Sequence, residues 1–187
     1  MTNDGSGTVT IVNARTVRVT CKESDGTAIE TARVLLEAAT GGDLPFAEAV
    51  TLSVTSSVCT ATHTAHGLTT GKKVAIKSLD IAGVTSATNL RGVKTITVTG
   101  VNAYTYATTA GDGTPTGTIT STAVILDGSS NASGVVEDTS FSFTNTQPVT
   151  GIVRKSTASP LFVPAPLSGS ITSAGGYDVI ATMGSDE

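Results

Sequence analysis

Short stretches in which hydrophobic and polar residues alternate run through almost the whole chain. The alternation has a period of two, which is typical of strands that bury one face and leave the other in water. In residues 16–20 it places Val17 and Val19 on one face and polar residues on the other. Similar stretches occur at residues 8–12, 32–38, 50–62, 93–99, 103–108, 118–126, 134–139, 141–144, 149–155 and 177–183. The pattern predicts an all-β fold.

Turn-forming residues separate these stretches. Asp25-Gly26 predicts a tight hairpin turn, because glycine accepts the positive φ that such turns need. The next stretch has a rival interpretation, a helix over residues 28–39, since Ala, Leu and Glu favour helices. The turn before it and the Gly41-Gly42 break after it favour a strand, with Val34 and Leu36 on one face.

The alternation over residues 50–62 is longer than a usual strand of about five or six residues. We therefore expect one module to end and the next to begin near Ser56 and Ser57. Residues 127–134 are rich in turn formers and read as a connection. These two boundaries define a discontinuous domain, residues 8–56 plus 127–187, and an inserted module, residues 57–126. Lengthening a surface loop costs little entropy, and the two ends of such an insertion should emerge side by side.

Composition narrows the architecture. A chain of 187 residues suits one large domain or two small ones. Hydrophobic residues make up 39%, charged residues 14% and aromatic residues 4%, with no Trp. This is too little charge for a disordered chain and too few large side chains for a thick core. It predicts thin sandwiches or barrels built from Val, Ile and Thr.

Charge limits the partners. A net charge of −4 and a pI near 5.1 argue against nucleic acid, because phosphate binding requires clustered Lys and Arg. The adjacent basic pairs, Lys72-Lys73 and Arg154-Lys155, are interpreted as solvated turns or strand edges. No stretch approaches the about 20 apolar residues of a membrane helix, and the N-terminus lacks the pattern of a secretory signal. We therefore expect no nucleic acid and no membrane as partner.

Candidate chemistry is sparse. Cys21 and Cys59 are too few for a disulfide framework and are interpreted as small buried thiols, with a bridge between them as the alternative. His63 and His66 have only Cys59 near them in sequence, whereas zinc takes three or four ligands. We expect His66 to bond to backbone in the turn before Gly67. Neither histidine has a nucleophilic residue at a spacing typical of a catalytic pair. No catalytic residue, metal or cofactor is therefore predicted.

Two sets of residues are candidates for contacts with other molecules. Residues 159–167 hold three of the six prolines, and a segment without these N–H donors belongs on a sheet edge or in an extended arm. The candidate partner contacts are Pro160, Leu161, Phe162, Val163, Pro164 and, in the loop at residues 41–49, Phe46. Packing against the protein's own core is the alternative. Tyr104 and Tyr106 share a strand face, where they cover the open side of a small barrel or offer a ligand a stacking platform.

Residues 57–126 carry an ordered set of motifs. These are His66-Gly67-Leu68, Thr70-Gly71-Lys72-Lys73-Val74, residues 92–98 and Asn102-Ala103-Tyr104-Thr105-Tyr106. In this order they resemble a small β module that recurs in bacteriophage virion proteins and looks like the small inserted β-barrel of ubiquitin-activating enzymes. Lys72 stands where the family has an acidic residue. The resemblance implies a virion context and no enzymatic activity.

The flanking residues 16–55 and 127–183 resemble, taken together, the immunoglobulin-like or transthyretin-like sandwich domains of phage structural proteins and surface proteins. The matching residues are Asp25-Gly26, Ala32-Arg33-Val34 and the run at 149–155. The two resemblances imply an Ig-like β-sandwich interrupted by an inserted small β-barrel module.

The expected function follows from these resemblances. We predict a non-enzymatic phage virion structural protein, assembled in the host cytoplasm, that acts as a capsid decoration or cement protein. Its partners would be other virion proteins, major capsid or tail proteins, and it would occur as a homo-oligomer or in repeated copies on the particle. A tail or tail-fibre accessory protein and a carbohydrate-binding adhesin module are the alternatives.

Overall fold

The computed structural model describes residues 14–155, 159–172 and 174–186, which form fourteen strands and one short 3-10 helix. These residues contain no α-helix, so the predicted all-β class is confirmed. None of their helices is long and apolar enough to span a membrane. The strand predicted at residues 8–12 lies outside the described residues.

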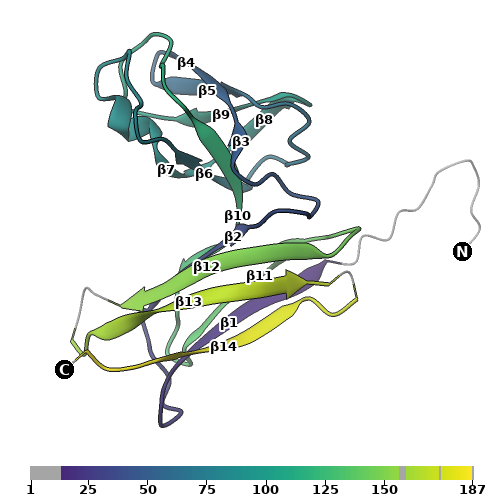
Figure 1. The fold of residues 1–187 in the computed structure, drawn as a ribbon, viewed down its shortest axis with the longest axis vertical. Coiled ribbons are helices and arrows are strands. Elements are labelled where there is room, and N and C mark those ends of the chain that lie inside the picture. Colours follow the sequence, from purple (N-terminus) through teal and green to yellow (C-terminus); the bar gives the residue numbers. More distant parts are fainter. Residues whose placement is uncertain (1–13, 156–158, 173, 187) are drawn as a thin grey trace, which may run out of the picture.

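The longer strands form two sheets that lie one above the other in the lower part of Figure 1. They are β1 Arg15–Glu23, β2 Arg33–Ala38, β10 Thr120–Ser129, β11 Val135–Phe141, β12 Gln147–Lys155, β13 Phe162–Ile171 and β14 Tyr177–Met183. One sheet has the order β11-β1-β14, with β1 parallel to β14, and the other begins β13-β12-β2-β10. We call these strands, with β10 counted from Val124 onward, the long-strand lobe.

The alternation of the sequence explains how this lobe forms its core. In β2 the side chains of Val34, Leu36 and Ala38 are fully buried, whereas Leu35 between them is only half-buried. The predicted strand and its inward face are confirmed, and the rival helix is wrong. A helix would have placed these three residues around its axis, not on the single face that the opposite sheet covers.

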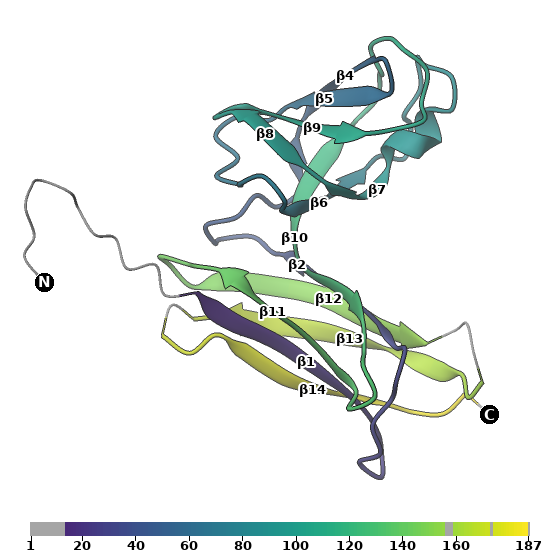
Figure 2. The same ribbon diagram turned by 180° about the vertical axis from the view of Figure 1, so that it is seen from behind.

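The shorter strands form a second lobe, at the top of Figures 1 and 2. They are β3 Glu48–Ala49, β4 Thr51–Thr55, β5 Val58–Thr62, β6 Lys73–Lys77, β7 Gly92–Thr95, β8 Thr97–Gly100 and β9 Ala103–Ala107, with the 3-10 helix η1 Ala87–Leu90. One sheet has the order β4-β5-β9-β8, while β6 and β7 extend the large sheet beyond β10. We call them, with residues 120–123 of β10, the short-strand lobe.

The described strands of this lobe do not close into the predicted barrel. The chain changes sheets at Ile96, which is buried between the end of β7 and the start of β8. No backbone pairing joins β7 to β8. The sheet β4-β5-β9-β8 and the β6-β7 part of the large sheet therefore stay open and share one core.

The strand β10 belongs to both lobes. Its first residues pair with β3 and β6, and its later residues pair with β2 after a register shift between Val124 and Leu126. Thr120 pairs with Ala49, so the chain enters and leaves the short-strand lobe on neighbouring strands. Ser56 and Ser57, where we expected one module to hand over to the next, have φ of 51° and 64° and form the hairpin turn between β4 and β5. The change of lobe instead lies between β2 and β3.

Candidate functional site

The proline-rich segment forms an edge of the large sheet. β13 pairs with β12 on one side, and this edge position agrees with the expectation from its prolines. Leu161 and Val163 have 42% and 49% of their surface exposed, while Phe162 between them is buried. The segment is anchored, because the Val163 N–H donates to the Gly184 carbonyl at 2.9 Å and the Asp186 N–H donates to the Leu161 carbonyl at 3.0 Å. Two aliphatic side chains are therefore held outward.

The other predicted contact residues fall into two places. Pro160 and Pro164 are exposed and flank the pair Leu161 and Val163. Phe46 is also exposed, but it lies in the connection between β2 and β3, at the joint of the two lobes, and not on β13. The structure thus brings residues 160–164 together and leaves Phe46 apart from them. Phe162 faces the core, so it contributes packing and not a contact surface.

Tyr104 and Tyr106 do not form an exposed platform. Both rings are buried in the core of the short-strand lobe. The Tyr104 hydroxyl donates to Ser121 Oγ at 2.8 Å, and the Tyr106 hydroxyl donates to the Leu90 carbonyl at 3.3 Å. Burial raises the pKa of Tyr104 to about 12, partly offset by its bond to Ser121. The stacking interpretation is therefore wrong for these two residues, whose face of β9 points into the core.

The two histidines lie against Tyr104. The His66 ring accepts a bond from the Leu68 N–H at Nδ1, at 3.0 Å, and its Nε2 contacts the Gly100 carbonyl at 3.2 Å. The predicted backbone role of His66 is confirmed. The His63 ring is 1% exposed and makes no hydrogen bond among the described residues, with Nε2 3.8 Å from Glu48 Oε2. Burial lowers the pKa of His63, and the Glu48 carboxylate opposes this effect.

Three lysines fix the joint between the lobes, and two of them form the pair Lys72-Lys73 that the sequence assigned to a solvated turn or strand edge. Lys72 Nζ donates to the Ser140 carbonyl at 2.8 Å and to Ser140 Oγ at 2.7 Å, and it lies 3.5 Å from the centre of the Phe141 ring. Lys73 and Lys77 form ion pairs at 2.8 Å and 2.7 Å with carboxylates of the long-strand lobe, Asp127 and Glu37 respectively. Lys72-Lys73 is therefore not a solvated turn. Only the tertiary fold reveals this, because the partners lie 40 to 68 residues away.

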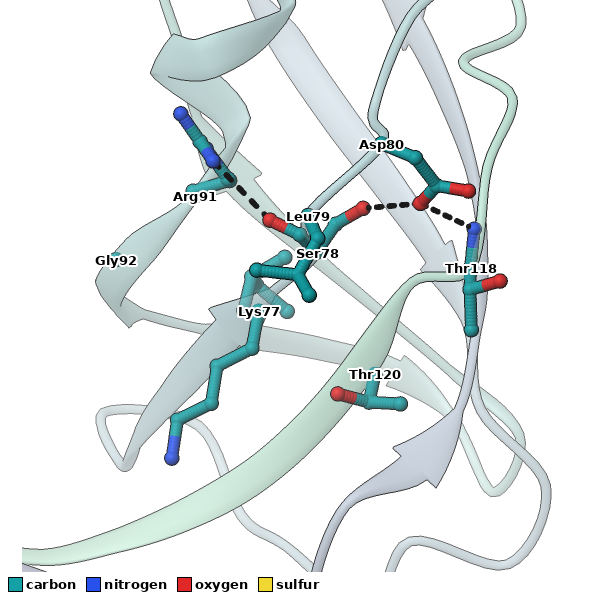
Figure 3. Close-up of a pocket in the computed structure, with 9 residues that line it drawn as sticks. Lys77, Ser78, Leu79, Asp80, Arg91, Gly92, Thr118 and Thr120 are labelled. Atoms are coloured by element: carbon teal, nitrogen blue, oxygen red, sulfur yellow. Dashed lines mark hydrogen bonds between the residues drawn. The ribbon is translucent and has the colours of Figure 1, made fainter.

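A groove of about 860 Å³ opens beside the last residues of β6 and the first of β7 (Figure 3). Leu79 is fully exposed at its margin, and Lys77 and Arg91 line it. Arg91 Nη1 donates to the Ser78 carbonyl at 3.1 Å, and Asp80 accepts bonds from Ser78 Oγ and the Thr118 N–H at 3.1 and 2.8 Å. Asp80 thus holds the loop in place. The groove offers an apolar floor with two cationic side chains.

Among the described residues no group of three or more His, Cys, Asp or Glu side chains could hold a metal ion. Cys21 and Cys59 are both buried and unbridged, and burial raises the pKa of Cys21 to about 11. Searches with protein-family models, curated proteins and solved structures find no significant match to the chain.

Proposed function

We propose that this chain is a non-enzymatic structural protein of a bacteriophage virion, most simply a capsid decoration or cement protein. The observation that carries the proposal is the outward pair Leu161 and Val163 on an anchored, proline-rich edge strand. Apolar side chains at the centre of an interface supply most of its binding energy. A pair that is already fixed in the free protein loses little conformational entropy when a partner covers it.

The two-lobed architecture supports the same role. The long-strand lobe offers the apolar pair at one end, and the short-strand lobe projects from it on β10 (Figure 1). The short-strand lobe carries the motifs that resemble the phage virion module. We infer that the long-strand lobe makes the anchoring contact with the particle and that the short-strand lobe points away from it.

Strand order discriminates between the two sandwich resemblances. An immunoglobulin domain pairs its first strand with its second. Here the first strand, β1, pairs with the fourth and seventh strands of its lobe, β11 and β14, while β2 pairs with β10 and β12. We therefore infer a transthyretin-like sandwich in place of the Ig-like one, interrupted by the short-strand lobe.

The alternatives have less support. A tail accessory protein would use the same apolar pair on a different partner, and only the location on the particle distinguishes it. A carbohydrate-binding adhesin depends on exposed aromatic rings, and the burial of Tyr104 and Tyr106 removes the pair on which that idea rested. Tyr177 is buried as well.

The proposal is tested by binding purified protein to purified particles of the phage that encodes it. Co-sedimentation with the particles, at a saturating and reproducible number of copies, is expected. The double variant Leu161→Asp/Val163→Asp should lose this binding, because two carboxylates would have to be desolvated in the interface. Val101→Asp is the matched control, since Val101 is exposed in the short-strand lobe, away from the pair.

Two results would overturn the proposal. One is the absence of the protein from purified virions by mass spectrometry. The other is binding by Leu161→Asp/Val163→Asp that equals that of the parent protein, which would show that the particle uses a different surface. Labelling of head and tail fractions separately decides between decoration and tail accessory roles.

A further inference from the structure

The outer face of the large sheet gathers cations in a protein whose net charge is −4. Register places Arg33 and Leu35 of β2 beside Arg154 and Ile152 of β12, and Lys73 reaches the same face from β6. Lys77 follows Lys73 on that face, four residues along β6. We call Arg33, Leu35, Lys73, Lys77, Ile152 and Arg154 the cationic face.

The carboxylates of the cationic face are more buried than its basic side chains. The side chains of Asp127 and Glu37 are 7% and 11% exposed, whereas those of Arg33, Lys73 and Lys77 are 38% to 53% exposed. Arg33 and Lys73 share Asp127, and Lys77 pairs with Glu37. What the face presents to an approaching molecule is therefore mainly positive charge.

One pair on the face is unfavourable in the isolated protein. Arg33 and Arg154 are direct cross-strand partners. Like charges directly opposite each other destabilise a sheet. Asp127 is the carboxylate that pairs with Arg33, and no described carboxylate forms an ion pair with Arg154. A carboxylate from outside the chain would relieve this repulsion.

The face is also hollowed and partly apolar. Arg33, Arg154 and Asp127 line a hollow of about 160 Å³ together with Leu35, Val93 and Ile152. Ile152 is exposed. Such a surface fits a protruding loop that carries carboxylates, with room for small side chains between them.

The end of the long-strand lobe that lies away from the short-strand lobe carries a loop of this kind. The β1–β2 connection protrudes there, at the bottom of Figures 1 and 2. Glu23 ends β1, and Asp25 and Glu30 lie in the connection; none of the three forms an ion pair within the described part of the chain. Asp25 Oδ1 accepts a bond from the Thr27 N–H at 2.8 Å, which shapes the tip and lowers the pKa of Asp25. The loop is therefore preshaped and charged at neutral pH.

We propose that the acidic β1–β2 loop of one copy docks on the cationic face of a second copy. The two surfaces differ, so the contact is heterologous and builds a ring or an open row of copies, not a two-fold dimer. A loop on a sheet face is a small contact, and interfaces below about 1,200 Å² are weak and transient. The association is a property of the pure protein and is independent of the proposed particle contact.

The first test of the proposed association uses the wild-type protein. In sedimentation equilibrium at about 10 mM ionic strength, where the Debye length is about 30 Å, the average mass should rise with protein concentration. In about 1 M salt, where the Debye length falls to about 3 Å, it should return to that of the monomer. A protein that stays monomeric at both ionic strengths up to millimolar concentration would overturn the proposal.

Charge reversal tests the pairing of the two surfaces. Variant A, Ile152→Glu/Arg154→Glu, makes the face acidic and leaves the Asp127 ion pairs intact. Variant B, Glu23→Lys/Asp25→Asn/Glu30→Lys, turns the three negative charges at the loop into two positive ones, and the Asn side chain keeps the acceptor for the Thr27 N–H. Each variant alone should lose association, because its two surfaces then repel. An equimolar mixture of A and B should associate again, because the acidic face of A attracts the basic loop of B.

The control places two glutamates on the other sheet, which changes the net charge by −2, against −3 in variant A. Ile180→Glu/Thr182→Glu changes two exposed residues of β14, on the other sheet, and should associate like the wild type. Circular dichroism of each variant checks that it is folded. Association of variant A or B at wild-type strength, or a mixture of the two that stays monomeric, would overturn the proposal. Leu161→Asp/Val163→Asp should self-associate as strongly as the wild type while it loses particle binding. This result would distinguish the contact between copies from the contact with the particle.

Discussion

The two lobes fill their cores with different chemistry. In the long-strand lobe the inward-facing residues of β1 and β2 are aliphatic or thiol side chains, and Phe141 stacks on Phe143 at 5.8 Å. The short-strand lobe buries two histidines and two tyrosines together, with ring centres of His63, His66 and Tyr104 5.4 to 5.8 Å apart. The long-strand core adds to its aliphatic packing two hydrogen-bonded polar side chains, Gln147 and Ser130, whereas the short-strand core gathers polar rings in one place.

The two lobes also differ in the charge on their surfaces. The long-strand lobe is covered by ion pairs such as Arg18 with Glu137. The sheet β4-β5-β9-β8 instead shows an uncharged outer face, on which Ser53, Thr60, Thr105 and Thr97 stand in register across four strands. Threonine favours strands through its branched side chain, so these residues stabilise the sheet without charge. The outer face of this sheet therefore contributes little charge that could respond to pH.

The largest expected effect comes from two deletions that remove the short-strand lobe at different boundaries. Removing residues 57–126 deletes Val124, Ile125 and Leu126, which the long-strand lobe needs beside β2, so this variant should not fold. Removing residues 42–121 keeps these residues and joins β2 to β10 by a short turn, so the long-strand lobe should fold cooperatively. Urea unfolding followed by circular dichroism distinguishes the two. If both variants fold equally well, β10 is not the shared element described above.

A smaller but still large effect is expected for two adjacent leucines of β2. Leu36 is fully buried, and Leu36→Ala should lower the free energy of unfolding by about 2–5 kcal/mol through lost burial and a residual cavity. Leu35 faces outward, and Leu35→Ala should cost about 1 kcal/mol or less. The pair compares the same substitution on opposite faces of one strand, measured by urea denaturation. Similar costs for the two would contradict the assigned faces.

The joint between the lobes should show an intermediate effect. Lys72→Met keeps the aliphatic stem but removes the bonds to Ser140 and the charge over Phe141. A partly exposed cation–π contact contributes about 0.5–1 kcal/mol and a charged hydrogen bond contributes somewhat more, so a loss of about 1 kcal/mol is expected. Hydrogen exchange at residues 141–144 should accelerate in parallel. Lys22→Met is the control, and an equal response from it would argue against a specific joint.

The sequence predicted local features well and long-range ones poorly. Period-two alternation predicted β2 and its inward face, and proline chemistry predicted that residues 159–167 lie at an edge. The backbone role of His66 also followed, because its partner Leu68 is two residues away. These features depend on neighbours in the chain, where residue types and spacing carry the information.

The missed features depend on which strands meet. Lys72 was interpreted as solvated because nothing near it in the chain marks Ser140 as its partner, 68 residues on. The pairing of Arg33 with Arg154 requires the register of β2 and β12, which alternation alone does not define. The tyrosines were placed on a common face correctly, but whether that face is open or covered depends on the sheet that packs against it.

The smallest expected effect is a pH response that belongs to the short-strand core. Burial lowers the pKa of His63 below its ordinary value near 6.5, so the folded state favours the neutral ring. The unfolded chain then binds more protons as pH falls below about 6.5, and stability should decrease until the pH passes the folded-state pKa. His63→Phe should flatten this dependence in urea titrations between pH 8 and pH 5. Glu48→Gln should steepen it, because Glu48, whose Oε2 lies 3.8 Å from Nε2, is the charge that favours the protonated ring. The slope of stability against pH that remains in His63→Phe then measures the contribution of the other titratable groups, and a slope equal to that of the parent protein would show that His63 does not cause the pH response.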